Sequence, residues 1–127
     1  MPEAVLDASA VLAYVHREQG WETVEDLLTR SLLSAVNLTE VVASLVRHGT
    51  DPTLARVVVE RLGCEIVPVG FELAFRAGAL ERETRALGLS LGDRSCLALA
   101  EQEGVPAVTA DRAWGRLALP VAVTMLR

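Results

Sequence analysis

The order of apolar and polar positions predicts short strands and helices that alternate along the chain. Short apolar runs typical of buried strands are followed by segments with apolar residues at helical spacing. Strands are expected at residues 4–6, 32–36, 65–69, 105–109 and 121–126. Helices are expected at residues 8–16, 21–28, 37–47, 52–62, 71–87 and 90–103, with a helical turn at 112–117. This alternation predicts an α/β fold with a mainly parallel sheet of about five strands, covered by helices on both faces.

The composition fits one domain with an aliphatic core. The chain has 127 residues, of which 51% are hydrophobic and only 4% aromatic, so Leu, Val and Ala must fill the interior. No Pro-, Gly- or Ser-rich stretch divides the sequence, and we expect residues 1–127 to form a single domain. No apolar run approaches the roughly 20 residues of a membrane span, and the first residues lack a signal-peptide pattern. We therefore expect a cytoplasmic protein.

The charged residues exclude several kinds of mechanism. The formal net charge is −5, which argues against a broad basic surface that would wrap nucleic acid. All 12 basic residues are arginines, so chemistry that needs a lysine amine is excluded. The glycine-rich motifs of P-loop and dinucleotide-binding proteins are also absent. Cys64 and Cys96 lie far apart without metal-ligand spacing, and we interpret them as reduced, mostly buried thiols in preference to a disulfide.

Four acidic residues fall where a parallel sheet would bring them together. Asp7 ends the first strand, and Asp111 follows the fourth. Glu40 and Asp93 lie in the first turns of helices, and the helix of Glu40 directly follows the second strand. Ligands of open α/β sheets bind beyond the carboxyl ends of the strands. The four carboxylates are therefore expected to converge.

Helix capping is the alternative explanation for each acid. Asp and Glu are favoured at helix N-termini, and the segments Asn37 to Glu40 and Ser90 to Asp93 both have capping-box spacing. Taken singly, capping is the better interpretation of Glu40 and Asp93. Asp7 has apolar neighbours on both sides, so its carboxylate needs either a bound cation or a cap formed by nearby hydroxyl and amide groups.

Together, the four acids indicate metal-dependent hydrolysis. Four carboxylates at one edge of a small domain would repel one another unless cations lay between them. Carboxylates and water are the ligands that Mg²⁺ and Mn²⁺ prefer. A pair of such ions can activate a water and stabilise the leaving oxygen of a phosphodiester. The sequence therefore predicts hydrolysis of phosphodiester bonds.

Four sequence motifs resemble those of PIN domains in their order and spacing. They are Asp7-Ala-Ser-Ala-Val-Leu12, Ser34-Ala-Val-Asn-Leu-Thr-Glu40-Val41, Leu89-Ser-Leu-Gly-Asp93-Arg-Ser-Cys-Leu-Ala98 and Thr109-Ala-Asp111-Arg-Ala-Trp114. The resemblance spans nearly the whole chain, and the short single-domain form is similar to the VapC toxins of bacterial toxin–antitoxin pairs. It implies a PIN-like three-layer α/β/α domain with Mg²⁺- or Mn²⁺-dependent endoribonuclease activity.

The resemblance also implies roles for individual residues and for partners. The expected catalytic and metal-binding quartet is Asp7, Glu40, Asp93 and Asp111. Ser9 and Thr109 would support this quartet by hydrogen bonding to the carboxylates or to metal-bound water. The family further implies a homodimer and a cognate antitoxin whose C-terminal segment occupies the active-site groove.

Further expectations concern three arginines and one glycine near the acids. Arg94, Arg112 and Arg116 flank the acidic positions and are candidate contacts to RNA phosphates, although surface arginines are more often only solvated. Gly92 stands where alanine is common in the family, and this departure should loosen the start of its helix slightly. No further acid follows Asp111 where some relatives carry one, which leaves the number of bound metals open.

Two other functions remain compatible with the sequence. A catalytically silent module could keep the same fold for dimer or partner binding. A metal-dependent DNA nuclease would use the same acids, because the metal cluster attacks any phosphodiester. Substrate contacts alone would distinguish RNA from DNA.

Overall fold

The structure, a computed structural model, describes residues 1–127 and contains one five-stranded sheet. The strands are β1 (Ala4–Leu6), β2 (Ser31–Ser34), β3 (Glu65–Val67), β4 (Ala107–Thr109) and β5 (Val123–Met125). The helices are α1 (Ala8–His16), α2 (Trp21–Leu27), α3 (Ala35–Arg47), α4 (Pro52–Glu60), α5 (Phe71–Ala79), α6 (Glu81–Thr84) and α7 (Leu91–Glu103), with 3₁₀ turns η1 (Leu28–Arg30), η2 (Arg85–Leu87) and η3 (Arg112–Arg116). Every neighbouring pair of strands is parallel, as the alternating pattern predicted.

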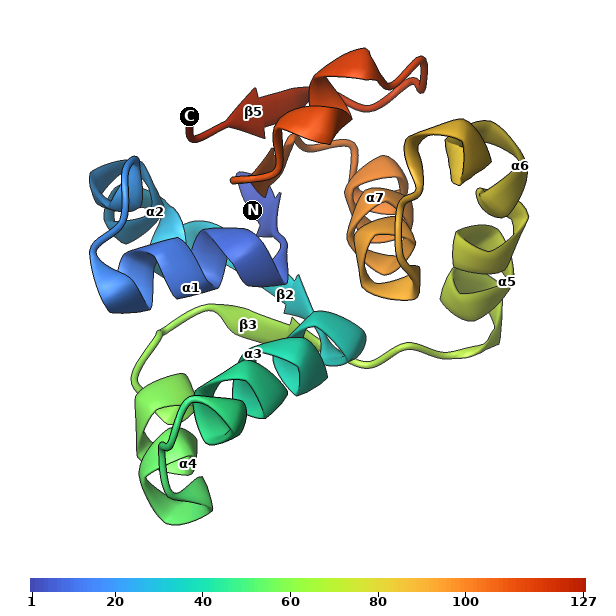
Figure 1. The fold of residues 1–127 in the computed structure, drawn as a ribbon. Coiled ribbons are helices and arrows are strands. Elements are labelled where there is room, and N and C mark those ends of the chain that lie inside the picture. The colour runs from blue at the N-terminus through green and yellow to red at the C-terminus, as the bar shows by residue number, and fades with distance from the viewer.

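Helices pack on both faces of the sheet, so the core has two halves (Figure 1). On β1, Ala4 and Leu6 face one half, whereas Val5 faces the other. The first half includes buried residues of α1, α2, α3 and α4, and the second includes residues of α5 and α7. Successive side chains of a strand point to opposite faces, which accounts for this division. The three-layer arrangement confirms the predicted fold class.

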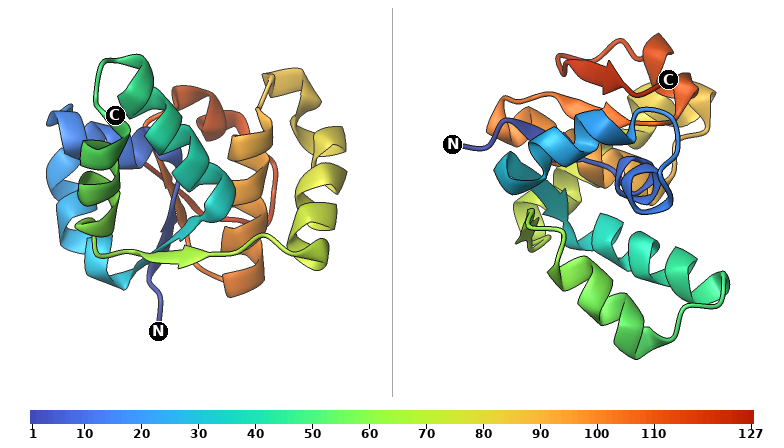
Figure 2. Two further views of the ribbon diagram at one scale, coloured as in Figure 1. Left: turned by 90° about the horizontal axis from the view of Figure 1, so that it is seen from below. Right: turned by 90° about the vertical axis from the view of Figure 1, so that its left-hand side faces the viewer.

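The strand order creates a switch point beside the central strand. The order is β3-β2-β1-β4-β5, so the chain first builds the sheet outward on one side of β1 and later on the other. Leu6 pairs with Leu33 on β2 and with Val108 on β4, and the residues that follow these three lie at one edge of the sheet. The hairpin of α3 and α4 projects from the sheet (Figure 2). An open α/β sheet binds ligands at such a switch point.

Several expected boundaries differ from the structure, and two of the differences have a clear physical cause. Helix α3 begins at Ala35 rather than at residue 37, because the Ser34 hydroxyl accepts the Asn37 N–H and caps the helix two residues earlier. The expected helix 71–87 is divided into α5, α6 and η2. At this division the Glu83 N–H bonds to the carbonyl of Leu80, three residues back instead of four.

The side chain of Arg94 lies against this division. Its Nε donates to the Ala77 carbonyl (3.1 Å), and its Nη1 donates to Glu81 Oε2 (2.6 Å) and to the Leu89 carbonyl (3.3 Å). Only 16% of the side chain is exposed. Arg94 therefore joins α7 to α5 and α6, and we do not retain it as an RNA contact.

Two further expectations concern membrane segments and cysteines. No helix has both the length and the apolar character needed to cross a membrane. Both cysteines are free thiols, as expected, with Cys96 buried and Cys64 half-buried. Burial raises the pKa of the Cys96 thiol well above its usual range, so it stays protonated at neutral pH.

Replacing Arg94 tests its assignment as a structural residue. Arg94→Met keeps an aliphatic stem but removes three hydrogen bonds from a mostly buried group, so the free energy of unfolding should fall by about 2 kcal/mol. Urea denaturation measures this loss. Arg82→Met, at an exposed position of α6, is the matched control. A loss no larger than that of the control would contradict the structural role.

Candidate functional site

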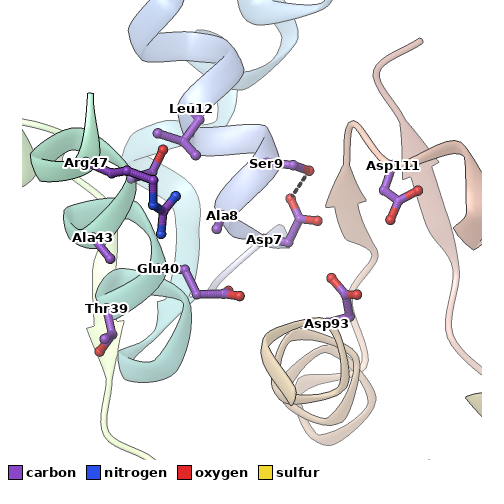
Figure 3. Close-up of a pocket in the computed structure, with 11 residues that line it drawn as sticks. Asp7, Ala8, Ser9, Leu12, Thr39, Glu40, Ala43, Arg47, Asp93 and Asp111 are labelled. Carbon is purple, nitrogen blue, oxygen red and sulfur yellow. Dashed lines mark hydrogen bonds between the residues drawn. The ribbon is translucent and has the colours of Figure 1, made fainter. Parts of the chain in front are cut away.

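A single cavity of about 470 Å³ opens at the switch point of the sheet. Its lining includes all four acids expected from the sequence, Asp7, Glu40, Asp93 and Asp111. They come from the end of β1, from α3, from the start of α7 and from the segment after β4, and they point toward a common space (Figure 3). The expectation that the four carboxylates converge is confirmed.

Asp7 is the most buried of the four acids, with 3% of its surface exposed. Its Oδ1 accepts hydrogen bonds from the Ser9 hydroxyl (2.7 Å) and from the Ala10 N–H (2.8 Å). Its Oδ2 accepts a hydrogen bond from the Thr109 hydroxyl (2.6 Å). Asp7 is therefore the N-cap of α1, and the expected hydrogen bonds from Ser9 and Thr109 to a carboxylate are present.

The same hydroxyl groups join the ends of β1 and β4. The Ser9 Oγ accepts the Ala110 N–H (2.9 Å), and the Thr109 Oγ1 accepts the Asp111 N–H (3.0 Å). The two hydroxyl oxygens lie 3.2 Å apart. A network of side chains thus fixes Asp7 in relation to the segment that carries Asp111.

These bonds do not fully replace the water that Asp7 loses on burial. Burial raises the pKa of Asp7 to about 6, although the bonds from Thr109, Ala10 and Ser9 act in the opposite direction. The negative charge of Asp93 raises this pKa further. A positive charge in the cavity would therefore stabilise the ionised form of Asp7.

Glu40 is on α3, and its carboxylate lies against the start of α7. Burial raises the pKa of its carboxyl group, the hydrogen bond from Asn37 lowers it, and the charge of Asp93 raises it. Asn37 is not the helix cap that the sequence suggested. It lies within the first turn of α3, and its Nδ2 donates to Glu40 Oε1 at 2.8 Å.

Asp93 and Asp111 both cap helical turns with one oxygen. Asp93 Oδ2 accepts the Ser90 N–H (2.8 Å) while Ser90 Oγ accepts the Asp93 N–H (3.2 Å), which confirms the expected capping box of α7. Asp111 Oδ1 accepts the Ala113 N–H (2.9 Å) at the start of η3. In each carboxylate the other oxygen has no hydrogen-bond donor from the protein.

The donor atoms around the cavity fit Mg²⁺ or Mn²⁺. The four carboxylates are hard oxygen ligands of the kind these ions prefer, and a bound cation would offset the burial that raises the pKa of Asp7 and of Glu40. No three acidic, histidine or cysteine side chains are spaced as ligands of one ion in this structure.

The structure adds Arg47 to the lining of the cavity. It lies on the same face of α3 as Glu40, seven residues or about 10 Å further along the helix. Its side chain has no ion-pair partner among the salt bridges of the protein. The spacing of two helical turns from Glu40 was the available sequence signal. Arg112 and Arg116 are exposed on η3 but do not line the cavity.

Comparison with known families decides the classification. The PIN domain family matches residues 4–119. The chain belongs to the PIN domain family. A comparison with curated protein sequences gives no significant match.

Solved structures share this PIN fold at low sequence identity. The DNA-bound VapBC of Salmonella typhimurium matches with a TM-score of 0.77 and 19% identity, over 100% of both chains. VapC20 of Mycobacterium tuberculosis, described as a sarcin-ricin loop cleaving toxin, matches with a TM-score of 0.71 and 16% identity, over 89% of this chain and 93% of that chain. VapBC-5 of the same organism matches with a TM-score of 0.66 and 22% identity, over 99% of both.

The raised pKa of Asp7 predicts how the stability of the metal-free PIN domain depends on pH. Because the folded protein holds this proton more tightly than the unfolded chain, stability falls as the pH rises from about 4 to about 6. A shift of about two pKa units corresponds to about 3 kcal/mol. Asp7→Asn cannot titrate, so relative to the wild type it should gain stability by about this amount between pH 4 and pH 7.

Urea denaturation in a chelating buffer at pH 4, 5, 6 and 7 measures this difference. Asp51→Asn is the matched control, since Asp51 caps α4 through the same kind of bond but is exposed. Parallel stability curves for the wild type and Asp7→Asn would contradict the raised pKa.

Proposed function

We propose that this PIN domain is a Mg²⁺- or Mn²⁺-dependent endoribonuclease and the toxin of a VapBC-type toxin–antitoxin pair. The observation that carries the proposal is the meeting of four carboxylates from four separate segments in one cavity. The sarcin-ricin loop cleaving activity in the description of VapC20 supports RNA as the substrate class. A toxin that cuts cellular RNA acts in the cytoplasm.

The acids would bind the metal, and the hydroxyl groups beside them would orient the acids. Asp7, Glu40, Asp93 and Asp111 would hold the metal, which when bound supplies an activated water and neutralises charge on the scissile phosphate. Ser9 and Thr109 keep the Asp7 carboxylate in one orientation. Ser90 holds one oxygen of Asp93 and leaves the other for the cavity.

Arg47 is the residue best placed to hold the RNA backbone. It lies in the same cavity as the carboxylates and has no acidic partner. An unpaired guanidinium at this distance from the metal-binding acids suits a phosphate of the same strand, away from the one that is cut. Arg112 and Arg116 remain proposed outer contacts at the rim.

We also propose a cognate antitoxin as the partner that blocks the cavity. Several structural neighbours are complexes of a toxin with its antitoxin, including one from Klebsiella pneumoniae. Four carboxylates without metal need a counter-charge, and a cationic side chain of an antitoxin would supply it. Homodimer formation, implied by the family resemblance, stays a prediction.

Cleavage of RNA tests the proposed chemistry. The purified chain, free of antitoxin, should cut total RNA when Mn²⁺ or Mg²⁺ is supplied and should leave it intact with a chelator. Asp7→Asn should abolish cleavage while the fold is kept, because the amide is isosteric with the carboxylate but a poor metal ligand. Gel analysis of the products, with circular dichroism of each variant, measures both effects.

The controls separate the competing functions. Asp51→Asn, at an exposed helix cap outside the cavity, should cut as the wild type does. Metal-dependent cutting of single-stranded DNA in preference to RNA would identify a DNA nuclease. Absence of cleavage, together with no Mn²⁺ binding by folded protein, would identify a catalytically silent module.

The proposed role of Arg47 predicts weaker RNA binding when the side chain is removed. In the slow-cleaving background Asp93→Asn, Arg47→Ala should lower the affinity for single-stranded RNA about fivefold, as expected for about 1 kcal/mol from an exposed charge contact. The slope of log K against log salt should decrease by about 0.7, the value for one phosphate of a single strand. Fluorescence anisotropy in Mg²⁺ measures both quantities.

Arg82→Ala in the same background controls for the loss of one positive charge, because Arg82 is exposed on α6 and has no ion-pair partner. Equal losses for Arg47→Ala and Arg82→Ala would mean that only net charge matters and that Arg47 makes no phosphate contact.

A further inference from the structure

Asn37 and Gly92 together fix the position of the Glu40 carboxylate. Asn37 lies on the first turn of α3 with 1% of its surface exposed, and Gly92 lies at the start of α7, directly before Asp93. Neither residue lines the cavity. Both contact Glu40, which does.

The side chain of Asn37 uses all of its main hydrogen-bonding positions. Its Oδ1 accepts from the Ser34 hydroxyl at 2.8 Å. Its Nδ2 donates to Glu40 Oε1 at 2.8 Å and to the Gly92 carbonyl at 3.0 Å. The reverse orientation of the amide would turn its oxygen toward two other oxygens. The amide therefore has one orientation, and it joins α3 to α7 through its bond to the Gly92 carbonyl.

Gly92 provides the space that this carboxylate occupies. A Cβ atom at residue 92 would lie 2.2 Å from Glu40 Oε1 and 2.3 Å from Oε2. Such contacts are far shorter than van der Waals distances, so any side chain at residue 92 would force the carboxylate to move. The φ angle of Gly92 is not positive, so its backbone does not require glycine. Glycine at this position is needed for space and not for its backbone conformation. The expectation that Gly92 only loosens the helix is therefore incomplete.

We infer that Asn37 and Gly92 are positioning residues that dock the Glu40 carboxylate on the first turn of α7, beside Asp93, and so hold one metal ligand in place. This inference rests on the proposed function and deepens it. Asn37 fixes the direction of the carboxylate, and Gly92 lets it approach α7. Neither residue touches the metal or the RNA.

The docking restricts the Glu40 carboxylate to the start of α7, the helix that carries Asp93. Glu40 and Asp93 carry like charges, which would otherwise push the flexible Glu40 side chain toward solvent. The hydrogen bond from Asn37 Nδ2 to Glu40 Oε1 opposes this repulsion, and the bond from the same nitrogen to the Gly92 carbonyl holds the amide in place. Groups that orient metal ligands commonly change metal affinity by about 10- to 100-fold when removed.

The Gly92→Ala variant tests the inference in a protein that should fold well. Alanine is a better helix former than glycine, but its Cβ would displace the Glu40 carboxylate. The affinity for Mn²⁺, measured by calorimetry without RNA, should fall by about tenfold or more. Gly78→Ala in α5 is the matched control, because a Cβ there meets nothing within 4 Å. Affinity within twofold of the wild type, or higher, would overturn the inference.

A metal-free double-mutant cycle shows whether the effect passes through Glu40. Removing the side chain in Glu40→Ala leaves room for a Cβ at residue 92, so Gly92→Ala should raise the melting temperature more in that background than in the wild type. Equal shifts in the two backgrounds would overturn the docking. Asn37→Leu, similar in size but without hydrogen bonds, should also lower Mn²⁺ affinity; if it does not fold, the Gly92 cycle still decides.

The two measurements separate this inference from the proposed function. If the folded wild-type protein binds no Mn²⁺, the proposed metal-dependent nuclease is wrong, while the melting-temperature cycle still tests the docking of Glu40. If the wild type binds Mn²⁺ and Gly92→Ala binds it equally well, the nuclease proposal stands and the positioning role is wrong.

Discussion

The burial of one carboxylate at the end of the central strand is the constraint on which the site depends. Asp7 follows β1, the central strand of the sheet, and only 3% of its surface is exposed. A carboxylate in this position is costly unless polar groups surround it. Ser9, Ala10 and Thr109 supply three donors, and two of these come from the helix that Asp7 itself caps. The third comes from β4, so the bond that stabilises Asp7 also fixes the neighbouring strand end.

Capping and metal binding, which the sequence presents as alternatives, are compatible for Asp93 and Asp111. Asp93 and Asp111 each satisfy a backbone N–H with one oxygen and leave the other without a protein donor. A carboxylate has about four lone-pair sites, so a cap does not exhaust it. The cap instead restricts the rotation of the side chain and lowers the entropy lost when a ligand binds. Helix starts that collect acids at one sheet edge are thus suited to holding cations.

The sequence was sufficient for the features that depend on periodicity and on strand ends. Five parallel strands, the two-sided core and the convergence of four acids all follow from alternating apolar segments and from the position of each acid in its segment. The features it missed depend on contacts between distant segments. From the sequence alone, Arg94 cannot be distinguished from a surface arginine, because its contacts with Ala77 and Glu81 depend on the fold. Likewise, the sequence shows Gly92 only as a weak helix former, because the close approach of the Glu40 carboxylate depends on the fold.

Under the proposed function, the charge distribution would restrict how this domain holds RNA. With a net charge of −5, four acids in the cavity and no lysine, the protein repels a phosphate backbone before metal binds. Two divalent ions would change the formal net charge from −5 to −1, and the whole change would fall at the site of cleavage. RNA would then be attracted only near the cavity and only when metal is bound. A few arginines such as Arg47 would help to orient it. A nuclease of this kind gains little from non-specific electrostatic binding, because few counterions are released. The proposed ribonuclease would therefore select its substrate by the shape of the RNA near the cavity and by those few arginine contacts.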